Sequence, residues 1–313
     1  GRPHAEQNAL QNVSKTNKKG SIIYISLEPC SHYGKTPPCV NEIISSKIKR
    51  VVYSIDDVDP RTSRKSFKIL RSKKISVKKN LFKNISKTIY KKYFYSKNKK
   101  IPYIYGKLAI SKDFYIKDKN NFYITNKHSL ATSHILRSKV NCILTTYKTI
   151  NNDNPKLTCR IDGLENFSPT KIIIDRDLKI KQNSYVLNKS KFQKTIIFHN
   201  SKNLKKINFL KKRGIKLIKI NTENDNYFDL KKIFKIIYDI GIHSILIESG
   251  KIFINKILSK NLFNEFYLFM SNRSLRNTNK VNISDVKRSL NIKFKSRNLV
   301  NTYLDKDKLL HYY

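Results

Sequence analysis

The sequence has no apolar run that reaches the roughly 18 residues of a membrane-spanning helix, and no signal-type segment opens it. Both absences favour a cytoplasmic protein with no membrane partner. No repeat period relates the two halves, and no G-x-G-x-x-G motif occurs, which argues against an ordinary Rossmann dinucleotide site. The 313 residues, of which 39% are hydrophobic and 28% charged, predict a globular protein of about two unlike domains.

Acidic residues are scarce, with 22 Asp and Glu against 65 Lys and Arg and a formal net charge of +43. One interpretation of this excess is nucleic-acid binding. The alternative is codon drift, because the excess is mostly Lys, spread along the whole chain beside much Ile and Asn, and all three have A/T-rich codons. Since no dense basic tail occurs, we favour drift, no nucleic-acid partner, and attraction for phosphorylated small molecules.

The chain has four cysteines. Cys30 and Cys39 lie in a proline-rich loop, whereas Cys142 and Cys159 lie in or beside apolar stretches with no mutual spacing pattern. In a cytosolic enzyme, this arrangement favours one metal-binding pair and two incidental thiols over two disulfides.

Strands and helices alternate along both halves of the sequence. In the first half we expect strands at 21–28, 50–55 and 74–77, helices at 4–17, 38–49 and 63–73, and a basic helix at 83–100 that runs into a linker. This alternation predicts a three-layer α/β domain with a largely parallel sheet over residues 1–98, followed by a second α/β domain over 99–313. In the second domain we expect strands at 102–111, 141–146, 171–175, 194–199, 215–220, 244–250 and 264–271, and helices at 126–140 and 228–241.

Four residues near the start have the chemistry of a zinc hydrolase. His4, Cys30 and Cys39 supply three ligands of the His and Cys type, which leaves one position of a catalytic zinc ion open. Glu6 can move protons between water and a leaving amine, as a non-ligand Glu does in zinc deaminases. The alternative is a surface histidine and two small buried thiols, but the combined arrangement of the four residues favours the site.

These residues carry a resemblance to a known family. "HAEQNAL" followed by "YISLEPCSHYGKTPPC" resembles the deaminase half of the bifunctional riboflavin-biosynthesis deaminase/reductases. The eight residues between the cysteines distinguish it from the C-x-x-C of nucleic-acid and cytidine deaminases. The resemblance implies one Zn²⁺ per deaminase domain. His32 and Lys35 are candidate contacts to a phosphoribosyl substrate, or else part of a polar loop that covers the metal.

The deaminase half also departs from the family pattern. The family has a helix, a first pair of strands and a P-N-P-x-V-G motif before His-Ala-Glu, and this sequence has none of them. Arg64 and Ser66 stand where the family has glycines, which puts in doubt the close backbone approach that glycine allows.

Residues 102–313 resemble the reductase half of the same family, which has a dihydrofolate-reductase-like fold and uses NADPH. The matching segments are "KLAISKDF", "YIT" and "LRSKVNCILTTYKTINNDNPKLTCR". The resemblance implies substrate contacts at Asn121, Arg137, Leu157, Arg160 and Glu248, with the arginines on a phosphate. It implies NADPH contacts at Ala109, Tyr123, Thr149, Asp153, Gly250 and Lys251, with a cofactor phosphate received at the helix start after Gly250. Phe114 replaces a family glycine, and Arg176 replaces a small polar residue.

The sequence therefore predicts a bifunctional enzyme of riboflavin biosynthesis. We expect it to deaminate a phosphorylated pyrimidine and then to reduce the ribosyl side chain with NADPH. We also expect a homo-oligomer formed through the reductase domain. The alternatives are a truncated or degenerate copy that retains only the reductase, and a nucleic-acid-editing zinc deaminase.

Overall fold

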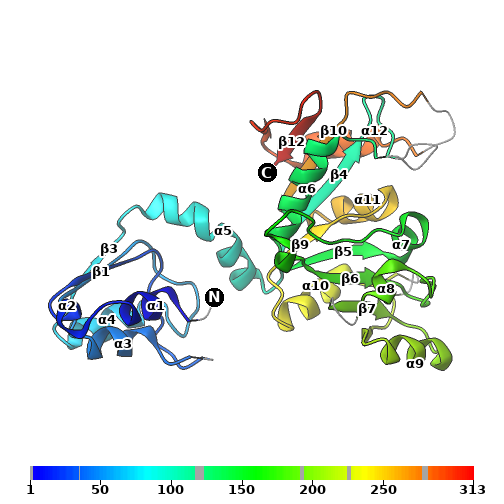
Figure 1. Ribbon diagram of the computed structural model, residues 1–313. Coiled ribbons are helices and arrows are strands. Elements are labelled where there is room, and N and C mark those ends of the chain that lie inside the picture. The colour runs from blue at the N-terminus through cyan, green and yellow to red at the C-terminus, as the bar shows by residue number, and fades with distance from the viewer. Residues whose placement is uncertain (1–2, 35, 117–122, 191–193, 224–226, 277–280) are drawn as a thin grey trace. The chain divides into compact units, whose positions relative to one another are not determined.

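The computed structural model describes residues 3–34, 36–116, 123–190, 194–223, 227–276 and 281–313. The chain divides into two compact units, Gly1–Lys99 and Lys100–Tyr313 (Figure 1). Among the described residues, no helix combines the length and the apolarity that crossing a bilayer requires.

The first unit is built on a small parallel sheet of order β1-β2-β3, as predicted. Its apolar face, which includes Val51 and Tyr53, packs with Leu10, Val40 and Leu70 of three helices. The strands are β1 (Ile22–Ile25), β2 (Arg50–Tyr53) and β3 (Ser76–Lys79), and the helices are α1 (Ala5–Gln11), α2 (Lys15–Lys18), α3 (Cys39–Ser45), α4 (Lys65–Ser72) and α5 (Lys83–Lys99).

The expectation of one helix over residues 4–17 is wrong. Asn12 ends α1, and Ser14 begins α2 as an N-cap whose hydroxyl accepts a hydrogen bond from the Asn17 amide at 3.3 Å. Serine favours a cap over a helix interior because its hydroxyl competes for backbone groups, so the polar stretch breaks there.

The second unit contains one sheet of order β11-β12-β10-β4-β9-β5-β6-β7-β8, in which every pair from β10 to β8 is parallel. β12 pairs antiparallel with both β10 and β11. The strands are β4 (Tyr103–Ile110), β5 (Cys142–Thr146), β6 (Thr170–Ile174), β7 (Thr195–His199), β8 (Lys216–Lys219), β9 (Ser244–Ile247), β10 (Glu265–Met270), β11 (Arg297–Leu299) and β12 (Lys308–Tyr312). The helices are α6 (Lys127–Ser138), α7 (Tyr147–Asp153), η1 (Glu165–Phe167), α8 (Tyr185–Asn188), α9 (Leu204–Lys212), α10 (Leu230–Asp239), α11 (Lys251–Ser259) and α12 (Ser284–Lys293).

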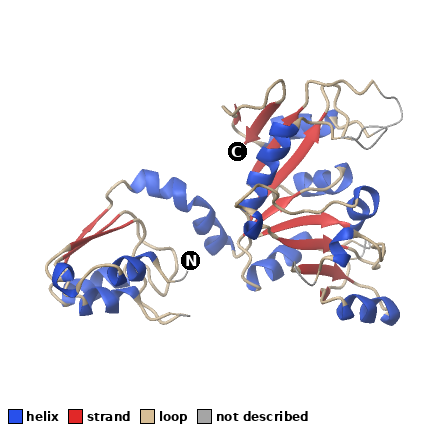
Figure 2. Ribbon diagram, in the orientation of Figure 1, coloured by secondary structure: helices blue, strands red, loops and turns tan. Residues whose placement is uncertain are grey.

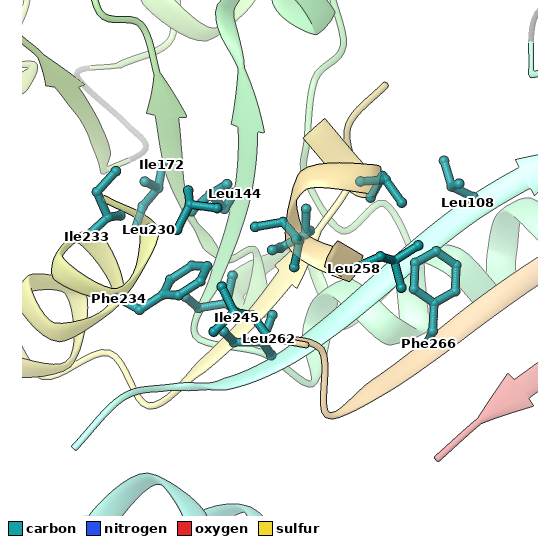
Figure 3. Packing of buried hydrophobic residues seen from close by; sticks show 14 of the residues in the cluster. Leu108, Leu144, Ile172, Leu230, Ile233, Phe234, Ile245, Leu258, Leu262 and Phe266 are labelled. Carbon is teal, nitrogen blue, oxygen red and sulfur yellow. The ribbon is translucent and has the colours of Figure 1, made fainter. Parts of the chain in front are cut away.

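The largest core lies on one face of this sheet. Figure 3 shows Ile233 and Phe234 of α10 directed toward the strands that carry Leu144, Ile172 and Ile245. All five side chains are fully buried. The amphipathic helix predicted at 228–241 is therefore confirmed as α10, which begins after Asp229, whose carboxylate accepts from the Lys231 amide.

The parallel strands place their carboxyl ends at one edge of the sheet (Figure 2). β4, β5, β9 and β10 all end there, and the segments that follow them supply polar side chains. Ligands in open α/β sheets bind at this edge, so the fold brings Glu248, which follows β9, to the expected position.

Candidate functional site

The three candidate zinc ligands of the first unit come together. His4 is the N-cap of α1, Cys30 lies in the loop between β1 and α3, and Cys39 is the first residue of α3. Their ligand atoms all lie within 4.8 Å of one another. His4 Nδ1 is 3.2 Å from Cys39 Sγ and 3.5 Å from Cys30 Sγ.

Hydrogen bonds at this cluster favour one thiolate. The Cys39 thiol and amide both hydrogen-bond to Cys30 Sγ, and together with His4 they lower the pKa of Cys30 to about 5. The amide nitrogen of Cys39 lies 3.2 Å from Cys30 Sγ and belongs to the first turn of α3, where amide groups have no helical partner. The pKa of Cys39 is raised, because its thiol donates to Cys30 and because it is buried.

Glu6 lies in the first turn of α1, two residues after His4, and is half-buried. Burial raises the pKa of its carboxyl above the usual range, and the carboxyl also interacts with the Cys39 thiol. The group therefore stands beside the ligands without belonging to the His/Cys/Cys set.

One imidazole and two thiol groups fit zinc. Zn²⁺ prefers Cys sulfur and His nitrogen, and three protein ligands leave one coordination position for water or substrate. Among the described residues, His4, Cys30 and Cys39 form a group of side chains whose ligand atoms lie close enough together to hold a metal ion.

The second unit contains a buried charge cluster at the carboxyl edge of its sheet. Arg137 of α6 donates two hydrogen bonds of 2.8 Å to the two carboxylate oxygens of Glu248. Lys107 of β4 has its Nζ 3.9 Å from Glu248 Oε2. Burial opposes ionisation of Glu248, but these two cations outweigh it and lower the pKa of its carboxyl to about 2.

Further polar groups surround this cluster. Arg137 also donates to the Thr158 carbonyl at 3.1 Å, and His134 Nδ1 lies 2.9 Å from the same oxygen. Burial and the nearby charges of Arg137 and Arg160 lower the pKa of His134 to about 4, so its ring is neutral at physiological pH. Arg160 is exposed, whereas Arg137 is almost fully enclosed by its partners.

Three hydroxyl groups gather beside the start of α11. Thr146 at the end of β5, Thr149 of α7 and Ser249 lie 3.3–3.4 Å from one another. Gly250 is the N-cap of α11, and no described atom lies within 4 Å of the point where a Cβ would stand. An open helix N-terminus beside hydroxyl donors suits an anionic group such as a cofactor phosphate.

The model of the RibD C-terminal domain family matches residues 102–297, which is more than half of the chain. The chain belongs to the RibD family. The model of the cytidine and deoxycytidylate deaminase zinc-binding region matches residues 1–55, the segment that holds His4, Cys30 and Cys39.

Known proteins match both units. Riboflavin biosynthesis protein RibD of Aquifex aeolicus is 30% identical over 273 residues, covering 87% of this chain and 74% of that protein. A diaminohydroxyphosphoribosylamino-pyrimidine deaminase of Buchnera aphidicola subsp. Schizaphis graminum is 49% identical over 94 residues, which are 30% of this chain and 63% of that protein. The solved deaminase/reductase of Thermotoga maritima matches with a TM-score of 0.78 and 25% identity, covering 99% of this chain and 85% of its own.

These matches confirm the predicted family, the α/β fold class with a deaminase-like part and a RibD C-terminal part, and the bifunctional deaminase/reductase activity in riboflavin biosynthesis. They also confirm a zinc-binding deaminase region.

Other residues that the RibD resemblance implied lie in varied settings. Ala109 packs beside the buried Phe269, Leu304 and Leu309. Leu157 is buried in a left-handed conformation with φ 54°. Tyr123 is exposed and close enough to Arg137 to contribute to the raised pKa of its guanidinium.

Two more of the implied residues carry a charge. Asp153 is exposed at the end of α7. Lys251 is directed at α12, with its Nζ 2.9 Å from both Asp285 Oδ1 and the Asn282 carbonyl. Lys35 and Asn121 lie outside the described residues.

Sequence reasoning missed several groups at these sites. Lys107 had a signal, since a lysine interrupts the otherwise apolar strand "YIYGKLAI". Ser249 stands between two residues that were singled out, Glu248 and Gly250. His134 had no distinguishing pattern, because a histidine on a helix is more often a surface or core residue.

Proposed function

We propose that residues 1–98 form a deaminase domain and residues 99–313 a reductase domain that act in succession. The first would hydrolyse the exocyclic amino group of a diaminopyrimidinone ribosylamino phosphate. The second would reduce the ribosyl side chain of the product to a ribityl group with NADPH. The observation that carries the first activity is the convergence of His4, Cys30 and Cys39 beside Glu6.

In the deaminase domain, His4, Cys30 and Cys39 would hold one zinc ion. When bound, zinc supplies Lewis-acid activation of water for attack on the pyrimidine ring. Glu6 takes a proton from the attacking water on its carboxylate and returns it to the nitrogen of the leaving amine. The raised pKa of this half-buried carboxyl suits both steps, because a stronger base takes up the proton more readily and keeps it until the leaving amine accepts it.

In the reductase domain, Thr149, Ser249 and the start of α11 after Gly250 would hold the phosphates of NADPH. When bound, NADPH supplies a hydride for C1′ of the opened ribose. Arg160, which is exposed, would bind the substrate phosphate with its planar guanidinium. Arg137 and Lys107 keep Glu248 ionised, so this carboxylate can accept hydrogen bonds from the substrate.

Replacement Glu6→Gln tests the deaminase. The variant should bind one zinc per chain, as the wild type does, and retain the reductase, but lose at least about 100-fold in deamination because the proton carrier is gone. Unchanged deamination would exclude Glu6 from this role. A wild-type chain that binds no zinc but still oxidises NADPH would support the reductase-only alternative.

Replacement Arg160→Ala tests the reductase. It should raise the KM for the deaminated phosphorylated substrate while zinc content and deamination stay unchanged. Arg288→Ala is the matched control, because Arg288 is an exposed arginine of α12 and its loss removes the same charge. If both variants raised the KM equally, Arg160 would contribute only general electrostatic attraction and would not bind the phosphate directly. The homo-oligomer and the cytoplasmic location remain predictions.

A further inference from the structure

The loop Asp57–Arg64, here the acidic loop, follows β2 and leads into α4, and the proposed chemistry does not use it. Its two carboxylates are buried, with Asp57 8% and Asp59 5% exposed, and its Thr62 is fully enclosed. Buried carboxylates require hydrogen-bond donors. The donors and acceptors around this loop therefore identify the segments that it holds together.

On its inner side, the acidic loop holds the segment Glu28–His32, which contains Cys30. Glu28 Oε2 accepts from the amides at both ends of the loop, Asp57 at 3.1 Å and Arg64 at 3.0 Å. His32 Nδ1 lies 3.0 Å from Thr62 Oγ1. In addition, the Ser31 hydroxyl donates to the Arg61 carbonyl at 3.2 Å.

On its outer side, the acidic loop is held by α5. The Tyr93 hydroxyl donates to Asp57 Oδ1 at 2.9 Å, and Lys97 Nζ donates to Asp59 Oδ2 at 3.2 Å. Asp57 Oδ1 also accepts from the backbone amide of Asp59 at 2.9 Å, which links the two acidic residues. Arg61 adds two side-chain bonds to Asp59.

We propose that Tyr93 and Lys97 are positioning residues for the deaminase site. By fixing Asp57 and Asp59, they hold the acidic loop against Glu28–His32 and thereby set the place of the His32 ring, two residues after the ligand Cys30. They act through the loop, since neither belongs to the His/Cys/Cys cluster. The inference rests on the proposed deaminase. It adds helix α5, which supplies no metal ligand, to the parts that shape the site.

The variants Tyr93→Phe, Lys97→Met and their combination test the proposal in the full chain. Each keeps the apolar body of the side chain and removes only the group that contacts the acidic loop. Tyr90→Phe is the matched control. Tyr90 lies on the same helix, and its hydroxyl is 2.6 Å from Ser26 Oγ, outside the acidic loop.

The double variant should raise the KM for deamination roughly five- to tenfold, since two hydrogen bonds to charged groups are lost. Its zinc content and its reductase activity should match the wild type. Backbone hydrogen exchange should become faster in residues 31–34 and 57–64. Tyr90→Phe should change none of these quantities.

Two results would overturn the proposal. One is unchanged exchange and KM in the double variant, and the other is loss of zinc in proportion to loss of activity, which would make the two residues supports of the metal cluster. A wild-type chain that binds zinc but does not deaminate would refute the proposed function instead. In that event, the exchange data would still decide whether α5 holds the loop.

Discussion

Gly106, in the middle of β4, lies where any side chain would collide with the core of the second unit. A Cβ at this position would stand 2.1 Å from Cδ2 and 2.3 Å from Cε2 of Phe266, and 2.8 Å from Cε1 of Phe263. Phe266 is fully buried and packs edge-to-face on Phe263 at 5.2 Å. A methyl group at Gly106 would therefore force these rings to shift. We predict that Gly106→Ala destabilises the second unit.

The magnitude follows from two opposing effects. Overpacking a core by one methyl group costs about 1–3 kcal/mol. Removing a strand glycine restores about 0.5–1 kcal/mol, because alanine loses less chain entropy on folding. The two ranges combine to a net loss of about 0–2.5 kcal/mol in the free energy of unfolding, and approaches as short as 2.1 Å favour its upper half, about 1–2.5 kcal/mol.

A double-mutant cycle with Phe266→Leu isolates the collision. Phe266→Leu alone should destabilise by about 1–2 kcal/mol through the space it leaves. Gly106→Ala should then add little, because the methyl group fills part of that space, and the coupling should be about 1 kcal/mol or more. Urea unfolding followed by circular dichroism, with hydrogen exchange of β4, measures these quantities. Additive losses, or a fully stable single variant, would refute the reasoning.

Three further predictions concern the two sites. Gly250→Ala should change stability by less than about 1 kcal/mol, since no described atom lies within 4 Å of the new methyl group, yet raise the KM for NADPH. Glu248→Gln should cost the second unit about 3–5 kcal/mol by thermal unfolding, because Arg137 and Lys107 lose their buried anion, and Lys107→Met should restore part of it. In the zinc-free chain, the lowered pKa of Cys30 means that its thiolate persists down to about pH 5. Iodoacetamide should therefore alkylate Cys30 at pH 6 and much more slowly below about pH 4. Peptide mapping measures this alkylation, and a Cys30 that reacts only at the pH of an ordinary thiol would contradict the prediction.

The parallel sheets and the metal cluster could be predicted because their signals are local. Buried parallel strands read as short apolar runs, and three of them, 141–146, 171–175 and 194–199, coincide with β5, β6 and β7 within one residue at each end. The helix α9 had no such signal, because four of its nine residues are lysine and only Leu210 is buried.

The replaced glycines show what sequence alone leaves open. Arg64 and Phe114 both adopt left-handed backbone, with φ of 60° and 67°, so a glycine would suit both positions. Yet the Arg64 amide is held by Glu28, and the Phe114 ring is partly buried against the main core with Lys287 Nζ 4.8 Å from its centroid. Ser66 is helical and hydrogen-bonds the Pro29 carbonyl. Such compensation depends on contacts between distant segments, which no pattern in the sequence specifies.

The outer contacts of the acidic loop also define how short an independent deaminase polypeptide can be. A chain cut after Lys79 would keep all three strands of the first sheet and every member of the metal cluster. It would nevertheless expose Asp57 and Asp59 to water by removing Tyr93 and Lys97. A chain cut after Lys99 would keep both carboxylates covered. The cover of these two carboxylates thus depends on a helix that an inspection of strands and ligands alone would discard as a linker.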